Sequence, residues 1–117
     1  MIKTVKSRQQ MLSLHLRDKN SLYAAYMPFL QNGGLFVPTH ESYELADEVF
    51  VLLTLPEQPD KIPVAGRVAW KTPVGAVGNR IPGIGVQFSE RDGPRVRNLI
   101  ETLLAGRLEQ DKPTHTL

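Results

Sequence analysis

The amino-acid sequence predicts a mainly β fold, a small antiparallel barrel of about six strands covered by one C-terminal amphipathic α-helix. Short apolar segments alternate along the chain with turns that contain Gly, Pro or Asn. Near the C-terminus the apolar residues instead recur with the period of a helix. A chain of 117 residues has room for one domain with a modest core. We place that domain at residues 1–111, followed by a flexible tail at residues 112–117.

The first expected strand is Met11–Leu16, in which three leucines alternate with one serine and one histidine. This period of two predicts one buried face. The polar residues 17–20 that follow are typical of a turn. The next segment, Ser21–Leu30, fits either a short helix or an irregular apolar stretch, because Pro28 limits any helix there.

A tight turn is expected at Asn32–Gly34, because both of its glycines accept a positive φ. A short strand at Leu35–Val37 then ends at Pro38. The acidic residues of Glu41–Glu48 indicate a solvated linking segment.

Three further strands are expected after this acidic segment. Val49–Leu55 is β-branched and nearly all apolar, which is typical of a central strand. Ile62–Lys71 is the next, and Gly66 within it suggests a bulge or a bend. A Gly- and Pro-rich loop at residues 72–82 leads to the last strand, Gly83–Phe88.

The one convincing helix begins near Pro94, a residue suited to a first turn. Its apolar residues are spaced 3, 1, 3 and 1 apart, which places them on one stripe: Val96, Leu99, Ile100, Leu103 and Leu104. Gly106 is a candidate for capping or fraying its end.

Composition excludes several classes of function. The chain has no cysteine, so disulfides, thiolate metal sites and thiol nucleophiles are absent. No apolar run is long enough to cross a bilayer or to form a signal-peptide core. The net charge of +2 and a stretch with six acids and no base, residues 41–60, argue against nucleic acid as a partner. A cytoplasmic protein without membrane insertion is therefore expected.

Residues 21–40 carry no Asp, Glu, Lys or Arg, yet they hold four aromatic side chains: Tyr23, Tyr26, Phe29 and Phe36. Part of this stretch is expected in the core. A chain of this size cannot bury all of it, however, and exposed aromatic groups on a small protein are typical of a surface that binds a partner.

We find no pattern that indicates catalysis, a metal or a cofactor. The three histidines, His15, His40 and His115, lack a set of convergent ligands at zinc-binding spacing. The glycine-rich segment at residues 78–85 has the outer spacing of a phosphate-binding loop, but Ile84 and Gly85 replace its lysine and hydroxyl residue. The acids of residues 41–48 fit a solvated loop better than a general acid–base pair. An enzyme is not expected.

Three segments in order resemble the PilZ domain family. Val64–Trp70 is similar to that family's G-x-V-x-W strand, and Gly83–Phe88 to its G-I-G-V-x-F strand. Asn32–Val37 resembles the end of its D/N-x-S-x-x-G turn and the strand that follows. The resemblance covers most of residues 10–105, and is strongest to the short single-domain members that act in type IV pilus assembly. It implies a PilZ-type β-barrel.

Most PilZ domains are receptors for cyclic di-GMP, which they hold with an R-x-x-x-R motif and the D/N-x-S-x-x-G turn. Guanidinium groups suit this ligand because they grip phosphate and stack on guanine. That R-x-x-x-R motif lies near the N-terminus of the family, and the N-terminal part of this sequence has none, since Arg8 is followed four residues later by Leu12 and Arg17 by Ser21.

The second motif is degenerate as well. Aligning its glycine on Gly34 places Gln31 at the serine position and Phe29 at the Asp/Asn position. The resemblance therefore implies a domain without the usual cyclic di-GMP site, in which apolar groups have replaced the polar groups that would bind the nucleotide.

By the same resemblance, the function expected is that of a non-enzymatic adaptor in pilus biogenesis and twitching motility, recruited to the pilus machinery at the inner membrane. Its expected partners are the pilus extension ATPase (PilB-like) and an EAL-domain protein that senses cyclic di-GMP (FimX-like). The expected partner-binding residues are Tyr23, Tyr26, Pro113, His115 and Leu117. Two alternatives stay open: a cyclic di-GMP receptor with a non-standard site, and a small barrel that binds nucleic acid.

Overall fold

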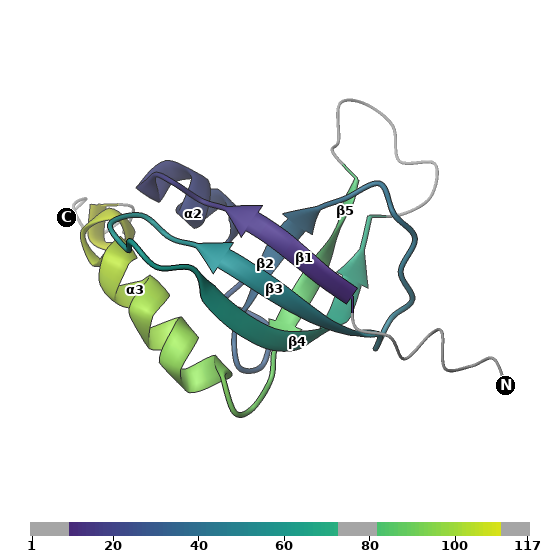
Figure 1. Ribbon diagram of the computed structural model, residues 1–117. Helices are drawn as coiled ribbons and strands as arrows, with labels where there is room; N and C mark the ends of the chain where they lie inside the picture. Colours follow the sequence, from purple (N-terminus) through teal and green to yellow (C-terminus); the bar gives the residue numbers. More distant parts are fainter. Residues whose placement is uncertain (1–9, 73–81, 111–117) are drawn as a thin grey trace, which may run out of the picture.

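Five strands form one curled, half-barrel sheet in the part of the chain that the computed structural model describes, residues 10–72 and 82–110 (Figure 1). The expected mainly β fold with a C-terminal helix is confirmed. In chain order the elements are β1 (Gln10–His15), α2 (Lys19–Ala25), β2 (Gly34–Pro38), β3 (Glu48–Thr54), β4 (Ile62–Lys71), β5 (Gly83–Phe88) and α3 (Gly93–Gln110).

The strands are ordered β1-β3-β4-β5-β2, so β1 and β2 lie at the two edges of the sheet. The pairings of β3 with β4, β4 with β5 and β5 with β2 are antiparallel, as expected. The pairing of β1 with β3 is parallel, which the sequence did not indicate. Between these two strands the chain runs through α2 and β2, and this long connection lets β3 start from the same end of the sheet as β1.

The polar segment after β1 begins a helix rather than a turn. The Asp18 carboxylate accepts a hydrogen bond from the Ser21 backbone N–H at 2.8 Å, which satisfies a free donor of the first turn of α2. This bond also lowers the pKa of Asp18. The helix ends at Ala25, before Pro28, so the stretch from 21 to 30 contains both a short helix and an irregular segment.

The irregularity of β4 lies further along the strand than Gly66, where the sequence predicted a bulge or a bend. The register between β4 and β5 shifts between Val68 and Trp70, whereas Gly66 keeps a regular partner in Phe88. Gly66 has a different role, because a Cβ atom there would stand 2.4 Å from the carbonyl oxygen of Gln87. The two strands approach closely at this point, which requires a residue without a side chain.

The core lies on the concave side of the sheet and is closed by α3. Alternate residues of every strand point into it, and Val96, Ile100 and Leu104 of α3 are fully buried against them. The carboxylate of Asp92 joins the start of α3 to the sheet, because its Oδ2 accepts a hydrogen bond from the Ala65 N–H at 2.9 Å.

The C-terminal helix begins at Gly93, one residue before the expected start. It continues through Gly106 to Gln110, so the prediction that this glycine ends or frays the helix is wrong. Within the described ranges, none of the helices is both long and apolar enough to span a membrane.

Candidate functional site

The turn before β2 has a backbone that few residue types allow. Asn32 and Gly33 both have positive φ angles, of 70° and 83°. The Gly33 N–H donates to the carbonyl of Leu30 at 2.8 Å, and the Gly33 carbonyl accepts from the N–H of Phe88 at 2.9 Å. A Cβ atom at Gly34 would stand 2.5 Å from the carbonyl oxygen of Val86. The expected turn is confirmed, and its glycines serve backbone geometry.

This turn is also fixed against the start of α3. The side-chain amide of Asn32 donates to the carbonyl of Phe88 at 3.4 Å. A Cβ atom at Gly93 would stand 2.9 Å from Cβ of Asn32, so the helix and the turn are in direct contact. Residues on the turn are therefore held in place by both β5 and α3.

Phe29 projects from the beginning of this turn, with 76% of its surface exposed. Gln31, two residues later, is exposed as well. An isolated exposed phenyl ring offers no hydrogen-bond donor or acceptor, so this part of the surface favours apolar contacts over nucleotide binding.

Tyr26 is buried, with 8% of its surface exposed. Its hydroxyl donates to Glu101 Oε2 at 2.6 Å, and Arg97 Nε donates to the same oxygen at 3.3 Å. Burial raises the pKa of the Tyr26 hydroxyl, and its hydrogen bond to the Glu101 carboxylate raises it further. The structure thus places Tyr26 between α2 and α3, with its polar end engaged inside the protein.

Of the other expected partner-binding residues, Tyr23 is described by the structure and those of the tail are not. Tyr23 on α2 is half-buried and packs against the core, so part of its surface remains open to a partner. The residues expected in the tail, Pro113, His115 and Leu117, lie outside the described residues.

A second exposed feature was missed by sequence reasoning. Three large side chains, which we call the Trp70 platform, meet over the glycines of β5: Met27, Phe36 and Trp70. The rings of Phe36 and Trp70 meet edge to face, with centroids 6.1 Å apart and planes at 61°. Trp70 is 38% exposed although it belongs to a central strand.

The Trp70 platform rests on two glycines of β5. A Cβ atom at Gly83 would stand 2.4 Å from Cζ of Phe36, and one at Gly85 would stand 3.0 Å from Sδ of Met27. The alternation of glycine with apolar residues in GIGVQF is the sequence signal that could have located it. Glycines that recur on one face of a strand leave room for bulky groups from neighbouring segments.

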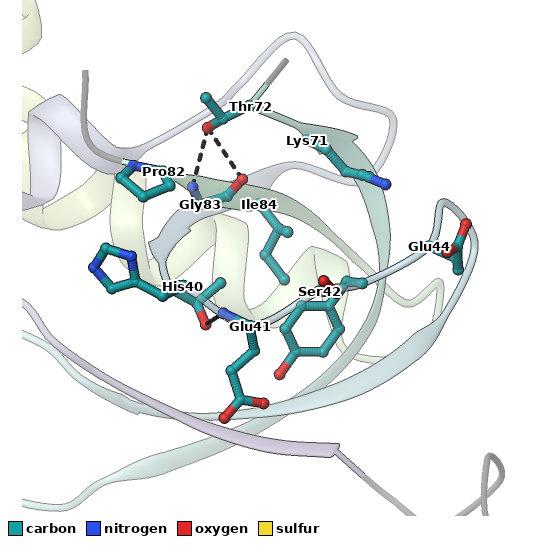
Figure 2. A pocket seen from close by; sticks show the side chains of 11 residues that line it. His40, Glu41, Ser42, Glu44, Lys71, Thr72, Pro82, Gly83 and Ile84 are labelled. Atoms are coloured by element: carbon teal, nitrogen blue, oxygen red, sulfur yellow. Dashed lines mark hydrogen bonds between the residues drawn. The ribbon is translucent and has the colours of Figure 1, made fainter. Parts of the chain in front are cut away.

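A hollow of about 220 Å³ lies where β4 and β5 meet the segment after β2 (Figure 2). Thr72 Oγ1 accepts from the Gly83 N–H at 3.0 Å and donates to the carbonyl of the same residue at 3.2 Å. Figure 2 shows the side chains of His40, Glu41 and Lys71 pointing in different directions. Polar groups that diverge in this way do not form a catalytic arrangement.

Residues 10–72 and 82–110 contain no cluster of three His, Cys, Asp or Glu side chains able to hold a metal ion. Comparison with known proteins identifies the family. The family model described as PilZ domain matches residues 8–106, most of the chain. The chain belongs to the PilZ domain family. No protein in the curated set matches it.

PilZ domains are typically non-catalytic binding domains, and the family is tied to cyclic di-GMP signalling and to pilus-related roles. In this PilZ domain the family's second ligand motif can be compared with the turn before β2 by aligning its glycine on Gly34. At the position of that motif's Asp/Asn stands Phe29, exposed, and at the serine position stands Gln31. Only Gly34 matches the motif.

Proposed function

We propose that this PilZ domain is a non-enzymatic adaptor of type IV pilus biogenesis and twitching motility. In this proposal it binds the pilus extension ATPase and an EAL-domain protein that senses cyclic di-GMP, and it does not itself hold cyclic di-GMP in the usual way. Through these contacts it is recruited to the pilus machinery at the inner membrane.

The observation that carries the proposal is the exposed phenyl ring of Phe29. In a cyclic di-GMP receptor this position supplies a polar group to the ligand. A phenylalanine there provides none, and its exposure is unfavourable unless a partner covers it.

The Trp70 platform supports the choice of a protein as the partner. Trp is among the residues most enriched at the energetically dominant centres of protein interfaces. Trp70 is preordered by its contact with Phe36, so little side-chain entropy would be lost when a partner covers it. Tyr23, half-buried on α2, is the second residue that we assign to partner contacts.

A binding experiment with purified proteins tests this function. We expect the extension ATPase and the EAL-domain protein to capture the full chain. For at least one partner, Trp70→Ala, Tyr23→Ala or truncation after Asp111 should weaken capture by about tenfold or more. Leu45→Ala is a matched control, because Leu45 is 61% exposed but is not part of the Trp70 platform. Equal capture of all variants would contradict the assigned surface, and no capture of the unmodified chain would contradict the function.

A further inference from the structure

Strands β3 and β4 carry apolar side chains on the face that points away from the core, which we call the outer face. Along β3, Val49, Val51 and Leu53 are buried, and the residues between them point to the opposite side. Two of these are Phe50 and Leu52, which are partly exposed and do not pack against the core. Figure 1 shows β1, β3 and β4 side by side, with no helix lying across them.

The register of β3 and β4 sets unlike side chains opposite each other on the outer face. The outward pairs are Glu48 with Arg67, Phe50 with Ala65, and Leu52 with Pro63. One row therefore combines an acid with a base, and the next combines a large side chain with a small one. In every row one member belongs to β3 and the other to β4.

The charged row of this face is unpaired within one copy. Glu48 and Arg67 are both exposed, and neither forms an ion pair with another residue in the part of the chain that the structure describes. Each is thus available to a charge of the opposite sign that approaches from outside.

The outer face is also hollowed beside its small residues. A hollow of about 200 Å³ is bordered by Glu48 and Phe50 on β3 and by Ala65, Gly66 and Arg67 on β4. A cavity of about 150 Å³ accommodates benzene. The hollow therefore has room for a phenyl ring that enters from a second molecule.

A second copy of this chain matches the face row by row. A two-fold axis that is parallel to the strands and runs between β3 and β4 would place β3 of each copy over β4 of the other. Glu48 of one copy would then face Arg67 of the other, and Phe50 would lie over Ala65 at the hollow. Because such an interface repeats every contact, both matches would occur twice. The strand directions of the two sheets would stay aligned, as is common in face-to-face packing.

We propose that the outer face of β3 and β4 is an interface between two copies of this chain. Each copy inserts Phe50 into the hollow beside Ala65 of the other, and two Glu48–Arg67 ion pairs flank the rings. The contact involves the outward residues of two strands and is smaller than the standard 800 Å² or so per partner, so the dimer is weak. This inference goes beyond the proposed function, and its residues are not part of the Trp70 platform.

Sedimentation equilibrium of the full chain, from about 10 μM to about 1 mM, tests the assembly. We expect the average mass to rise with concentration from that of a monomer toward that of a dimer. A monomer mass over the whole range would overturn the proposal.

Charge reversal tests which surface forms the dimer. Glu48→Arg would set two positive groups against each other, and Arg67→Glu two negative groups, so each should raise the dissociation constant at least about tenfold. Arg17→Glu is the matched control, because Arg17 is exposed, lies outside the outer face of β3 and β4, and changes the net charge by the same amount as Arg67→Glu. Equal effects of all three changes, or no effect of any, would contradict the assigned interface.

A mixture of the two reversed variants separates a lost contact from a damaged fold. In a mixed pair of Glu48→Arg with Arg67→Glu, both charged contacts join opposite signs again. A fluorescent label on Glu48→Arg follows that copy alone, at a concentration where it is a monomer by itself. It should dimerise with Arg67→Glu at least about tenfold more tightly than with Arg17→Glu, which leaves one like-charged contact. Equal binding to both would overturn the proposal.

The hollow is tested by filling it from within. Ala65→Leu makes the outer face more apolar but occupies the space that the Phe50 ring of the other copy would enter. Association through the hollow should weaken by about tenfold, whereas unspecific apolar association should become tighter. Tighter dimerisation of Ala65→Leu would therefore contradict the proposed packing.

These measurements use this chain alone, so they are independent of the proposed function. If the chain stays a monomer while the extension ATPase and the EAL-domain protein bind it, the interface is wrong and the function stands. If the chain dimerises as described and neither protein binds it, the function is wrong and the interface stands.

Discussion

The hydroxyl of Tyr26 donates a hydrogen bond of 2.6 Å to Glu101, which joins the end of α2 to the middle of α3 across 75 positions of the sequence. The two helices lie near the same end of the sheet and contact each other (Figure 1). The turn that carries Phe29 begins directly after this anchor. The Tyr26–Glu101 hydrogen bond therefore anchors the chain to α3 three residues before Phe29.

Removing this hydrogen bond should destabilise the domain without unfolding it. In Tyr26→Phe, Glu101 keeps only its contact with Arg97, and we expect the free energy of unfolding to fall by about 1–2 kcal/mol. Urea denaturation measures the change. Adding Glu101→Gln to Tyr26→Phe should cost less than the sum of the two single changes. Strict additivity of the two would show that the bond contributes nothing to stability.

Stability should fall at alkaline pH through the buried tyrosines. The pKa of Tyr26 and that of Tyr43 are both raised above the ordinary value of 10.0, chiefly by burial. A raised pKa means that the folded state favours the protonated form. The resulting stabilisation is complete below pH 10.0 and is lost as the pH rises above it. Tyr26→Phe should lose stability less steeply than the unmodified chain in denaturation series above that pH, and identical slopes would contradict this assignment.

Replacing Ala46 by glycine should stabilise the protein. Ala46 has a φ of 77°, a left-handed conformation that costs an L-residue roughly 1–2 kcal/mol. Its N–H donates to the carbonyl of Val68 at 2.7 Å, which holds it there. Glycine loses more backbone entropy on folding than alanine, which offsets part of this relief. We therefore expect the free energy of unfolding to rise by up to about 1 kcal/mol in Ala46→Gly. Ala69→Gly, at an exposed position of β4, should lose stability. Equal losses in both variants would show that Ala46 is not strained.

Fluorescence can report on the Trp70 platform, because Trp70 is the single tryptophan of the chain. Phe36→Ala removes the ring that meets it edge to face, so the indole becomes more exposed and its emission should shift to longer wavelength. We expect an accompanying loss of about 1–2 kcal/mol in the free energy of unfolding. Phe50→Ala, on β3, should leave the emission unchanged. A shift in both variants, or in neither, would contradict the contact.

Local patterns in the sequence were sufficient for most of the fold. The runs of β-branched and apolar residues predicted β3, β4 and β5, and the helical spacing predicted α3. Each of these patterns arises within one element, because side chains repeat with a period of two along a strand and of 3.6 along a helix. The parallel pairing of β1 with β3 could not be predicted in this way, since it depends on which strands meet after folding. The position of the β4 irregularity depended on the same long-range pairing.

The candidate site was predictable only where it follows a motif. The Asn32–Gly34 turn and the apolar replacement at Phe29 could both be seen in the sequence. That Tyr26 is buried and bonded to Glu101 could not, because an uncharged aromatic stretch does not reveal which of its rings face solvent. The Trp70 platform joins side chains from three separate segments and becomes visible only when those segments are paired.

The adaptor function proposed for this PilZ domain requires that it does not hold cyclic di-GMP in the usual way. Calorimetric titration of the full chain with cyclic di-GMP tests that claim directly. The exposed phenyl ring at Phe29 and the lack of an R-x-x-x-R motif near the N-terminus predict no saturable heat at micromolar concentrations of nucleotide. Saturable binding with a Kd of about 10 μM or tighter would contradict the account and would establish a cyclic di-GMP receptor with a non-standard site.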